Sequence, residues 1–235
     1  MGTSIMTPLQ YAEQIAYSSK AVLHFTYEMA KRFKDVPGVY CECGCAAGAQ
    51  IIAMAAGAPN KTIYAFDSFE GIPLPSNRDD QMPGISLLTK VEQLMLPDAG
   101  KQVLQSSGAT VVSEDHFWSH IANAFDKPIL SLDSNPPILS VPGIDINTVK
   151  GWFEDIMPRV SKKSFEIAIL RLDGDLYNST WVCLQHLFPK CIPGACIIVD
   201  DWTLKGCQDA CKEYFGLIGY EPDYKFLDGT AYFFK

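Results

Sequence analysis

The chain has 235 residues, of which 48% are hydrophobic and 20% charged, a profile typical of one globular α/β domain with a large buried core. Its net charge of −8 argues against a nucleic acid or an anionic membrane as partner, because both require a basic face. The sequence has neither the roughly 20-residue apolar run of a membrane helix nor a signal-peptide pattern. We therefore expect a cytoplasmic protein with reduced cysteines.

The first third of the chain predicts alternating helices and strands. Thr7-Pro8 opens a helix, because proline is favoured at the first helical position. The predicted elements are a helix over about 8–33, a strand at 39–42, a helix at 46–56 and a strand at 62–66. Cys41, Cys43 and Cys45 alternate near the first strand, and we interpret them as small packing residues because zinc sites use other spacings.

The stretch from about 71 to 148 is the least regular part and is rich in proline and glycine. Helices are expected near 86–96 and 114–125. A structureless loop of this length would be implausible in a compact domain. We interpret the stretch as an insertion that covers the site.

The last third returns to a regular pattern. It predicts a buried strand at 165–172, a helix at 179–188, a strand at 195–199 and a helix at 206–217. Asp228-Gly229 between alternating runs predicts a β-hairpin. The whole pattern predicts one domain over 1–235 with a doubly wound, mostly parallel sheet.

Two motifs follow the first two predicted strands. Glu42, Gly44 and Gly48 lie between a strand and a helix, where glycines permit a tight turn and a close approach to a ligand. Taken by itself, this motif is also compatible with a tight strand–helix turn that binds no ligand. Asp67 directly follows the second strand, where doubly wound folds bind ribose hydroxyls, and Ser68 adds a neighbouring hydroxyl.

Three aspartates follow the two later strands. Asp173 comes after the strand at 165–172, and Asp200 and Asp201 come after the strand at 195–199. If these strands are neighbours, the carboxylates converge and need a compensating charge. A divalent metal supplies it, with Mg²⁺ preferred and Mn²⁺ or Ca²⁺ as alternatives. The competing interpretation is that the acids cap the helices that follow.

These motifs resemble those of the macrocin O-methyltransferase family of class I S-adenosylmethionine-dependent enzymes. The matching strings are Glu42-x-Gly44, DSFEGIP from Asp67, GWFED from Gly151, RLDGDLYNST from Arg171, and Val199-Asp200-Asp201. They occur in the family's order over residues 39–202. Residues 74–148 do not resemble the family closely, which leaves the acceptor unidentified.

The resemblance implies a seven-stranded Rossmann-like sheet closed by the C-terminal hairpin. It implies that Glu42 and Gly44 hold the methionine end of the cofactor, that Asp67 holds the ribose, and that Gly151 and Trp152 lie near the adenine. It also implies a metal ion held by Asp173, Asp200 and Asp201, with Asp173 as the base.

The resulting hypothesis is a metal-dependent O-methyltransferase that acts on a sugar or a glycosylated natural product. His116 and His120 share one face of a predicted helix and are alternative bases. The same enzyme could instead methylate a catechol-type phenol or an amine. Two different functions also stay open: a non-catalytic cofactor-binding protein and a nicotinamide-dependent reductase. The last lacks the G-x-G-x-x-G motif. Association into a homo-oligomer is left open.

Overall fold

The computed structural model describes residues 6–79, 103–104, 111–126, 129–131, 138–139 and 143–235. Within them, a seven-stranded sheet forms the centre, in the order β10-β11-β9-β8-β1-β2-β7. The strands are β1 (Val39–Cys43), β2 (Thr62–Asp67), β7 (Asp145–Lys150), β8 (Ile167–Leu172), β9 (Cys191–Val199), β10 (Lys225–Leu227) and β11 (Thr230–Phe234).

Most neighbouring strands run parallel, and β11 pairs antiparallel with both β9 and β10. Asp228 and Gly229 form the hairpin turn with φ of 44° and 85°, the left-handed values that a tight two-residue turn requires. The predicted doubly wound sheet and its C-terminal antiparallel hairpin are therefore confirmed.

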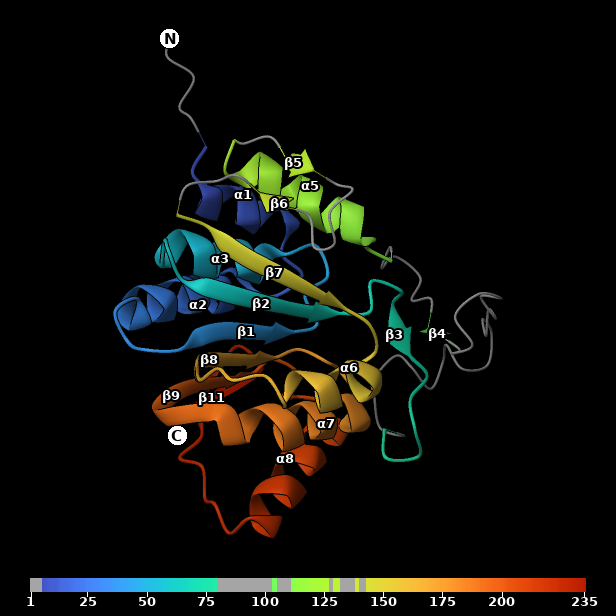
Figure 1. Cartoon of the computed structure of the whole chain (residues 1–235). Coiled ribbons are helices and arrows are strands. Elements are labelled where there is room, and N and C mark those ends of the chain that lie inside the picture. Colours follow the sequence, from blue (N-terminus) through green and yellow to red (C-terminus); the bar gives the residue numbers. More distant parts are fainter. Residues whose placement is uncertain (1–5, 80–102, 105–110, 127–128, 132–137, 140–142) are drawn as a thin grey trace.

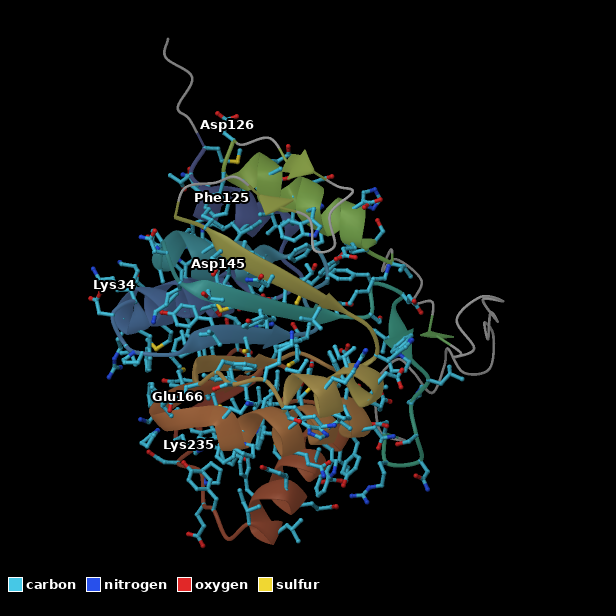
Figure 2. The ribbon with its side chains drawn as sticks, viewed as in Figure 1. Lys34, Phe125, Asp126, Asp145, Glu166 and Lys235 are labelled. Carbon is cyan, nitrogen blue, oxygen red and sulfur yellow. The ribbon has the colours of Figure 1, made fainter. Side chains whose placement is uncertain are left out.

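Helices cover both faces of the sheet (Figure 1). One layer contains α1 (Pro8–Ile15), α2 (Lys20–Phe33), α3 (Ala49–Gly57) and α5 (Glu114–Ala124); the other contains α6 (Phe153–Val160), α7 (Tyr177–Leu187), the 3-10 helix η1 (Phe188–Lys190) and α8 (Lys205–Leu217). Each layer buries its own apolar cluster against the sheet, and Figure 2 shows the side chains that fill the space between the layers. Strand β8 is buried at every position, as expected of a strand covered on both faces.

The predicted single helix over 8–33 is wrong, because the chain breaks into α1 and α2. Thr7 and Gln10 form a capping box that starts α1. The Ser19 hydroxyl accepts the Val22 N–H at 3.2 Å and so starts α2 as a separate helix. Ser19 is therefore a start signal inside a stretch whose pattern otherwise predicts one helix.

The stretch 71–148 is partly regular where the structure describes it. Strand β3 (Ile72–Pro73) pairs with β4 (Val103–Leu104), and β5 (Ile129–Ser131) pairs with β6 (Ile138–Leu139). The predicted helix near 114–125 is confirmed as α5, whereas the one near 86–96 lies outside the described residues. The stretch ends inside β7, so its last residues belong to the central sheet.

All eight cysteines are free and buried, which agrees with the interpretation of Cys41, Cys43 and Cys45 as packing residues. Among the helices of the described chain, we find none with the length and apolar character to cross a bilayer.

Candidate active site

A cavity of about 280 Å³ opens at the carboxyl ends of the strands. Six of the predicted site residues line it: Gly44, Asp67, Ser68, Gly151, Trp152 and Asp173. The other four, Glu42, Gly48, Asp200 and Asp201, lie outside its lining. The sheet order brings these motifs together, because β1 lies between β2 and β8.

Gly44 is held in the turn after β1 by its surroundings. Its φ is +87°, its N–H donates to the Phe66 carbonyl at 2.8 Å, and a Cβ there would lie 1.7 Å from the Asp173 carbonyl oxygen. Glycine is therefore required both by backbone conformation and by the close approach of the loop that carries Asp173.

We expect Gly44→Ala to destabilise the fold far more than Gly194→Ala, measured as the free energy of unfolding in urea. Gly194 has nearly the same φ, +82°, but a Cβ there meets nothing within 4 Å. Both changes cost the left-handed backbone strain of about 1–2 kcal/mol, and Gly44→Ala adds the clash with Asp173. Equal losses in the two variants would contradict the packing role of Gly44.

Asp67 organises the same turn from β2. Its Oδ2 accepts the N–H groups of Cys45 at 2.7 Å and Ala46 at 3.0 Å, and its Oδ1 accepts the Phe69 N–H at 2.7 Å. A carboxylate has about four acceptor positions, so Asp67 can also bind a ligand hydroxyl in the cavity. Sequence reasoning predicted the second role, which stays a prediction, and missed the first.

Glu42 and Gly48 lie outside the cavity lining and contact other parts of the protein. Glu42 is 1% exposed and pairs with Arg171. Gly48 precedes α3 with φ of +84°, and a Cβ there would lie 2.8 Å from the Phe117 ring. Gly48 therefore lets α5 pack against the glycine turn.

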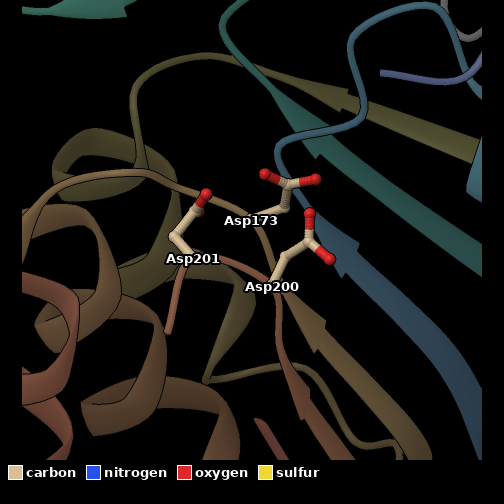
Figure 3. A group of neighbouring side chains, drawn as sticks. All are labelled: Asp173, Asp200 and Asp201. Atoms are coloured by element: carbon tan, nitrogen blue, oxygen red, sulfur yellow. The ribbon is translucent and has the colours of Figure 1, made fainter. Parts of the chain in front are cut away.

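Asp173, Asp200 and Asp201 form a cluster whose nearest carboxylate oxygens all lie within 4.8 Å of one another (Figure 3). Asp173 follows β8 and the other two follow β9; in Figure 3 the carboxylates of Asp173 and Asp200 face each other. The Asp175 N–H donates to Asp201 Oδ2 at 2.9 Å, so a bond from the backbone of one loop to a side chain of the other also joins the two loops. The predicted convergence of the three acids is confirmed.

A fully buried arginine supplies part of the compensating charge that we assigned to a metal alone. Nη1 of Arg171 donates to Glu42 Oε1 at 2.7 Å and to Asp173 Oδ2 at 2.6 Å, and Nη2 lies 2.7 Å from Asp200 Oδ1. Glu42 and Arg171 are paired in register on β1 and β8. The signal for this residue was present in the sequence as one charged side chain within a buried apolar strand.

One guanidinium does not neutralise the carboxylates around it. Burial raises the pKa of Glu42 to about 8 and that of Asp173 to about 7, although Arg171 opposes both shifts. Burial also raises the pKa of Asp175 to about 6, and burial together with Asp173 raises the pKa of Asp201. The cluster therefore favours an added positive charge, which a proton or a metal ion can supply.

His116 and His120 do not line this cavity. They line an adjoining one of about 440 Å³ between α1 and α5, and His120 Nδ1 lies 2.9 Å from the Tyr11 hydroxyl. Residues that do line the main cavity and were not foreseen include Tyr17, Phe153, Asp175 and Ser179. Asp173 is therefore better placed than either histidine to act on a ligand there.

Residues 141–235 match the family model of the macrocin-O-methyltransferases (TylF). A relative named 8-demethyl-8-(2,3-dimethoxy-alpha-L-rhamnosyl)-tetracenomycin-C 4'-O-methyltransferase, from Streptomyces olivaceus, is 37% identical over 90 residues, which are 38% of this chain and 34% of that protein. Demethyldecarbamoylnovobiocin O-methyltransferase from Streptomyces niveus is 30% identical over 186 residues, which are 77% of this chain and 59% of that protein. The chain thus spans less than two thirds of the length of these relatives.

Among solved structures, the O-methyltransferase NovP superposes with a TM-score of 0.68 at 24% identity, covering 92% of this chain and 80% of that chain. This likeness supports the class I methyltransferase fold that the strand order already indicates. With the family match on residues 141–235, the resemblance of this chain to the macrocin O-methyltransferase family is confirmed.

Proposed function

We propose that the protein transfers a methyl group from S-adenosylmethionine to a hydroxyl group of a sugar or glycosylated small molecule, with Mg²⁺ at Asp173, Asp200 and Asp201. The observation that carries the proposal is the three-aspartate cluster, of which Asp173 lines a cavity that is also lined by Gly44 and Asp67.

The charge of the cavity suits this cofactor. Asp67, Glu154, Asp173 and Asp175 line it, and its described lining contains no lysine or arginine. S-adenosylmethionine carries a sulfonium and an ammonium against one carboxylate, so its net charge is positive. A nicotinamide dinucleotide would bring a pyrophosphate against these acids, which argues against the reductase reading.

The donor set suits a hard divalent ion. Its ligands are carboxylate oxygens from three residues, as Mg²⁺ and Mn²⁺ prefer. Arg171 contacts one carboxylate oxygen of Asp173 and one of Asp200, and the Asp175 N–H donates to one carboxylate oxygen of Asp201. The second carboxylate oxygen of each aspartate can therefore bind an ion, while the contact to the first oxygen holds the carboxylate in a fixed orientation.

The chain's own residues then have distinct roles. Asp173 lines the cavity and receives the proton of the acceptor hydroxyl, while Arg171 holds its carboxylate in place. Asp67 and the turn at Gly44 bind and orient the cofactor. When bound, the cofactor supplies an electrophilic methyl group and the divalent ion lowers the pKa of a hydroxyl.

The names of the relatives support the acceptor class. The enzyme from S. olivaceus acts on a rhamnosylated tetracenomycin, and the one from S. niveus on a novobiocin derivative. A rhamnoside is therefore the acceptor with which we would begin.

We expect the purified protein to methylate p-nitrophenyl α-L-rhamnoside in the presence of S-adenosylmethionine, seen by mass spectrometry as a gain of one CH₂. EDTA should abolish this turnover and added Mg²⁺ should restore it. Turnover only on catechols or amines would contradict the acceptor class, and cofactor binding without turnover on any acceptor would support a non-catalytic protein. Turnover that withstands EDTA would contradict the metal assignment alone.

A further inference from the structure

Asp79 makes a set of contacts that the proposed chemistry does not use. It is 2% exposed and ends the described segment that follows β3. Its Oδ2 accepts the N–H of Ser76 at 2.9 Å and the hydroxyl of Ser76 at 2.7 Å. Its Oδ1 accepts the N–H of Tyr177 at 2.8 Å, from a residue 98 positions further along the chain.

This carboxylate caps helix α7 from outside. The residue at the N-cap of α7 is Leu176, whose side chain makes no capping hydrogen bond. The first N–H groups of a helix lack partners within it and carry partial positive charge, so a buried carboxylate at Tyr177 satisfies one of them and is stabilised in return.

The same carboxylate lies against the first turn of α8. A Cβ added at Gly206 would lie 2.1 Å from Asp79 Oδ1. The N-cap of α8, Leu204, likewise makes no side-chain capping bond. Glycine at 206 therefore makes room for Asp79 between the beginnings of two helices.

Those two helices follow the loops that carry the aspartate cluster. Helix α7 begins four residues after Asp173, and α8 begins four residues after Asp201. At the surface, the Arg78 guanidinium stacks 4.1 Å from the Tyr177 ring and pairs with Glu213, to which the Tyr177 hydroxyl also donates at 2.8 Å. The segment ending at Asp79 is thus fastened to both helices, and its Ile72 and Pro73 line the cavity.

We propose that Asp79 is a positioning residue for the metal cluster: by fixing the starts of α7 and α8 relative to each other, it sets the spacing between Asp173 and the Asp200-Asp201 pair. It touches neither cofactor nor acceptor in this role. The inference rests on the proposed metal-dependent function and extends it to a residue in the covering segment.

The test compares two glycine-to-alanine changes in the same helix. Gly206→Ala should displace Asp79, whereas Gly216→Ala is its matched control, because a Cβ at 216 meets nothing within 4 Å. We expect the Kd for Mn²⁺, measured by calorimetry on the full chain, to rise about tenfold in Gly206→Ala, the effect typical of outer contacts around a metal. Gly216→Ala should bind Mn²⁺ as the wild type does, and S-adenosylhomocysteine should bind all three proteins with the same affinity.

Asp79→Ala gives a second route to the same result and should weaken Mn²⁺ binding similarly. A purely structural role would lower the unfolding midpoint of both variants while leaving the Mn²⁺ affinity of the folded protein unchanged, and that outcome would overturn the inference. A wild type that binds no Mn²⁺ would instead overturn the proposed metal site, and this inference with it.

Discussion

Asp173→Asn is expected to lower kcat for the rhamnoside by roughly 10²–10⁴-fold, the usual effect of removing a general base. The change removes one of the acidic groups that line the cavity and weakens one of the three proposed metal ligands. Asparagine keeps a carbonyl oxygen that can still accept from Arg171 Nη1, so the fold should survive. The measurement is steady-state turnover, together with separate titrations of Mn²⁺ and S-adenosylhomocysteine.

The two titrations distinguish a loss at the proposed metal site from a general loss of ligand binding. Mn²⁺ affinity should fall, whereas S-adenosylhomocysteine affinity should change little, because Asp67 and the glycine turn are untouched. The control is Asp209→Asn, which removes an acid on α8 that pairs with Lys205 outside the cluster, and it should leave both kcat and metal affinity unchanged. If Asp173→Asn retained metal binding and full turnover, the role assigned to Asp173 would be wrong.

The acids of the site could be predicted because their signal is local. Asp173 directly follows one buried apolar strand and Asp200 directly follows another, and parallel strands present their carboxyl ends at one edge of a sheet. The condition that β8 and β9 are neighbours was an assumption, since strand order depends on how whole layers pack rather than on any local pattern. The structure supplies that condition through the pairing of Leu172 with Val199.

The charge balance of the site could not be predicted in the same way. Arg171 was visible as a charged residue in a buried strand, but its three partners lie in β1, in the loop after β8 and directly after β9. Asp79 gave no comparable signal, because its partner Tyr177 is 98 positions away. Contacts of this kind depend on tertiary packing, and a pattern of nearby residues carries no information about them.

The second large effect is expected for Arg171→Met, a substitution of similar length that removes the buried positive charge. Arg171 is 0% exposed, so its loss leaves Glu42, Asp173 and Asp200 with uncompensated charge. Breaking a buried ion pair on one side costs about 3–5 kcal/mol. We expect a loss of this size in the free energy of unfolding, measured in urea at pH 8 without metal.

The loss should shrink as the pH falls. The folded-state pKa values of Glu42, about 8, and Asp173, about 7, lie above their ordinary values near 4. An acid whose pKa is raised by folding makes its full contribution to stability when the pH is below its pKa in the unfolded chain. This contribution is lost as the pH rises through the folded-state pKa, here about 7–8. The metal-free wild type should therefore be more stable near pH 5.5 than near pH 8.5, and Arg171→Met should show a steeper decline.

Divalent metal separates this electrostatic explanation from a loss of packing. The proposed Mg²⁺ site exists only in the folded protein, so saturating Mg²⁺ should restore part of the stability of Arg171→Met at pH 8. Arg159→Met, at an exposed position on α6, is the control and should show neither the large loss nor the added pH dependence. A variant that is equally unstable at both pH values and indifferent to Mg²⁺ would mean that Arg171 contributes mainly by filling space, because a charge deficit must respond to protons or to metal.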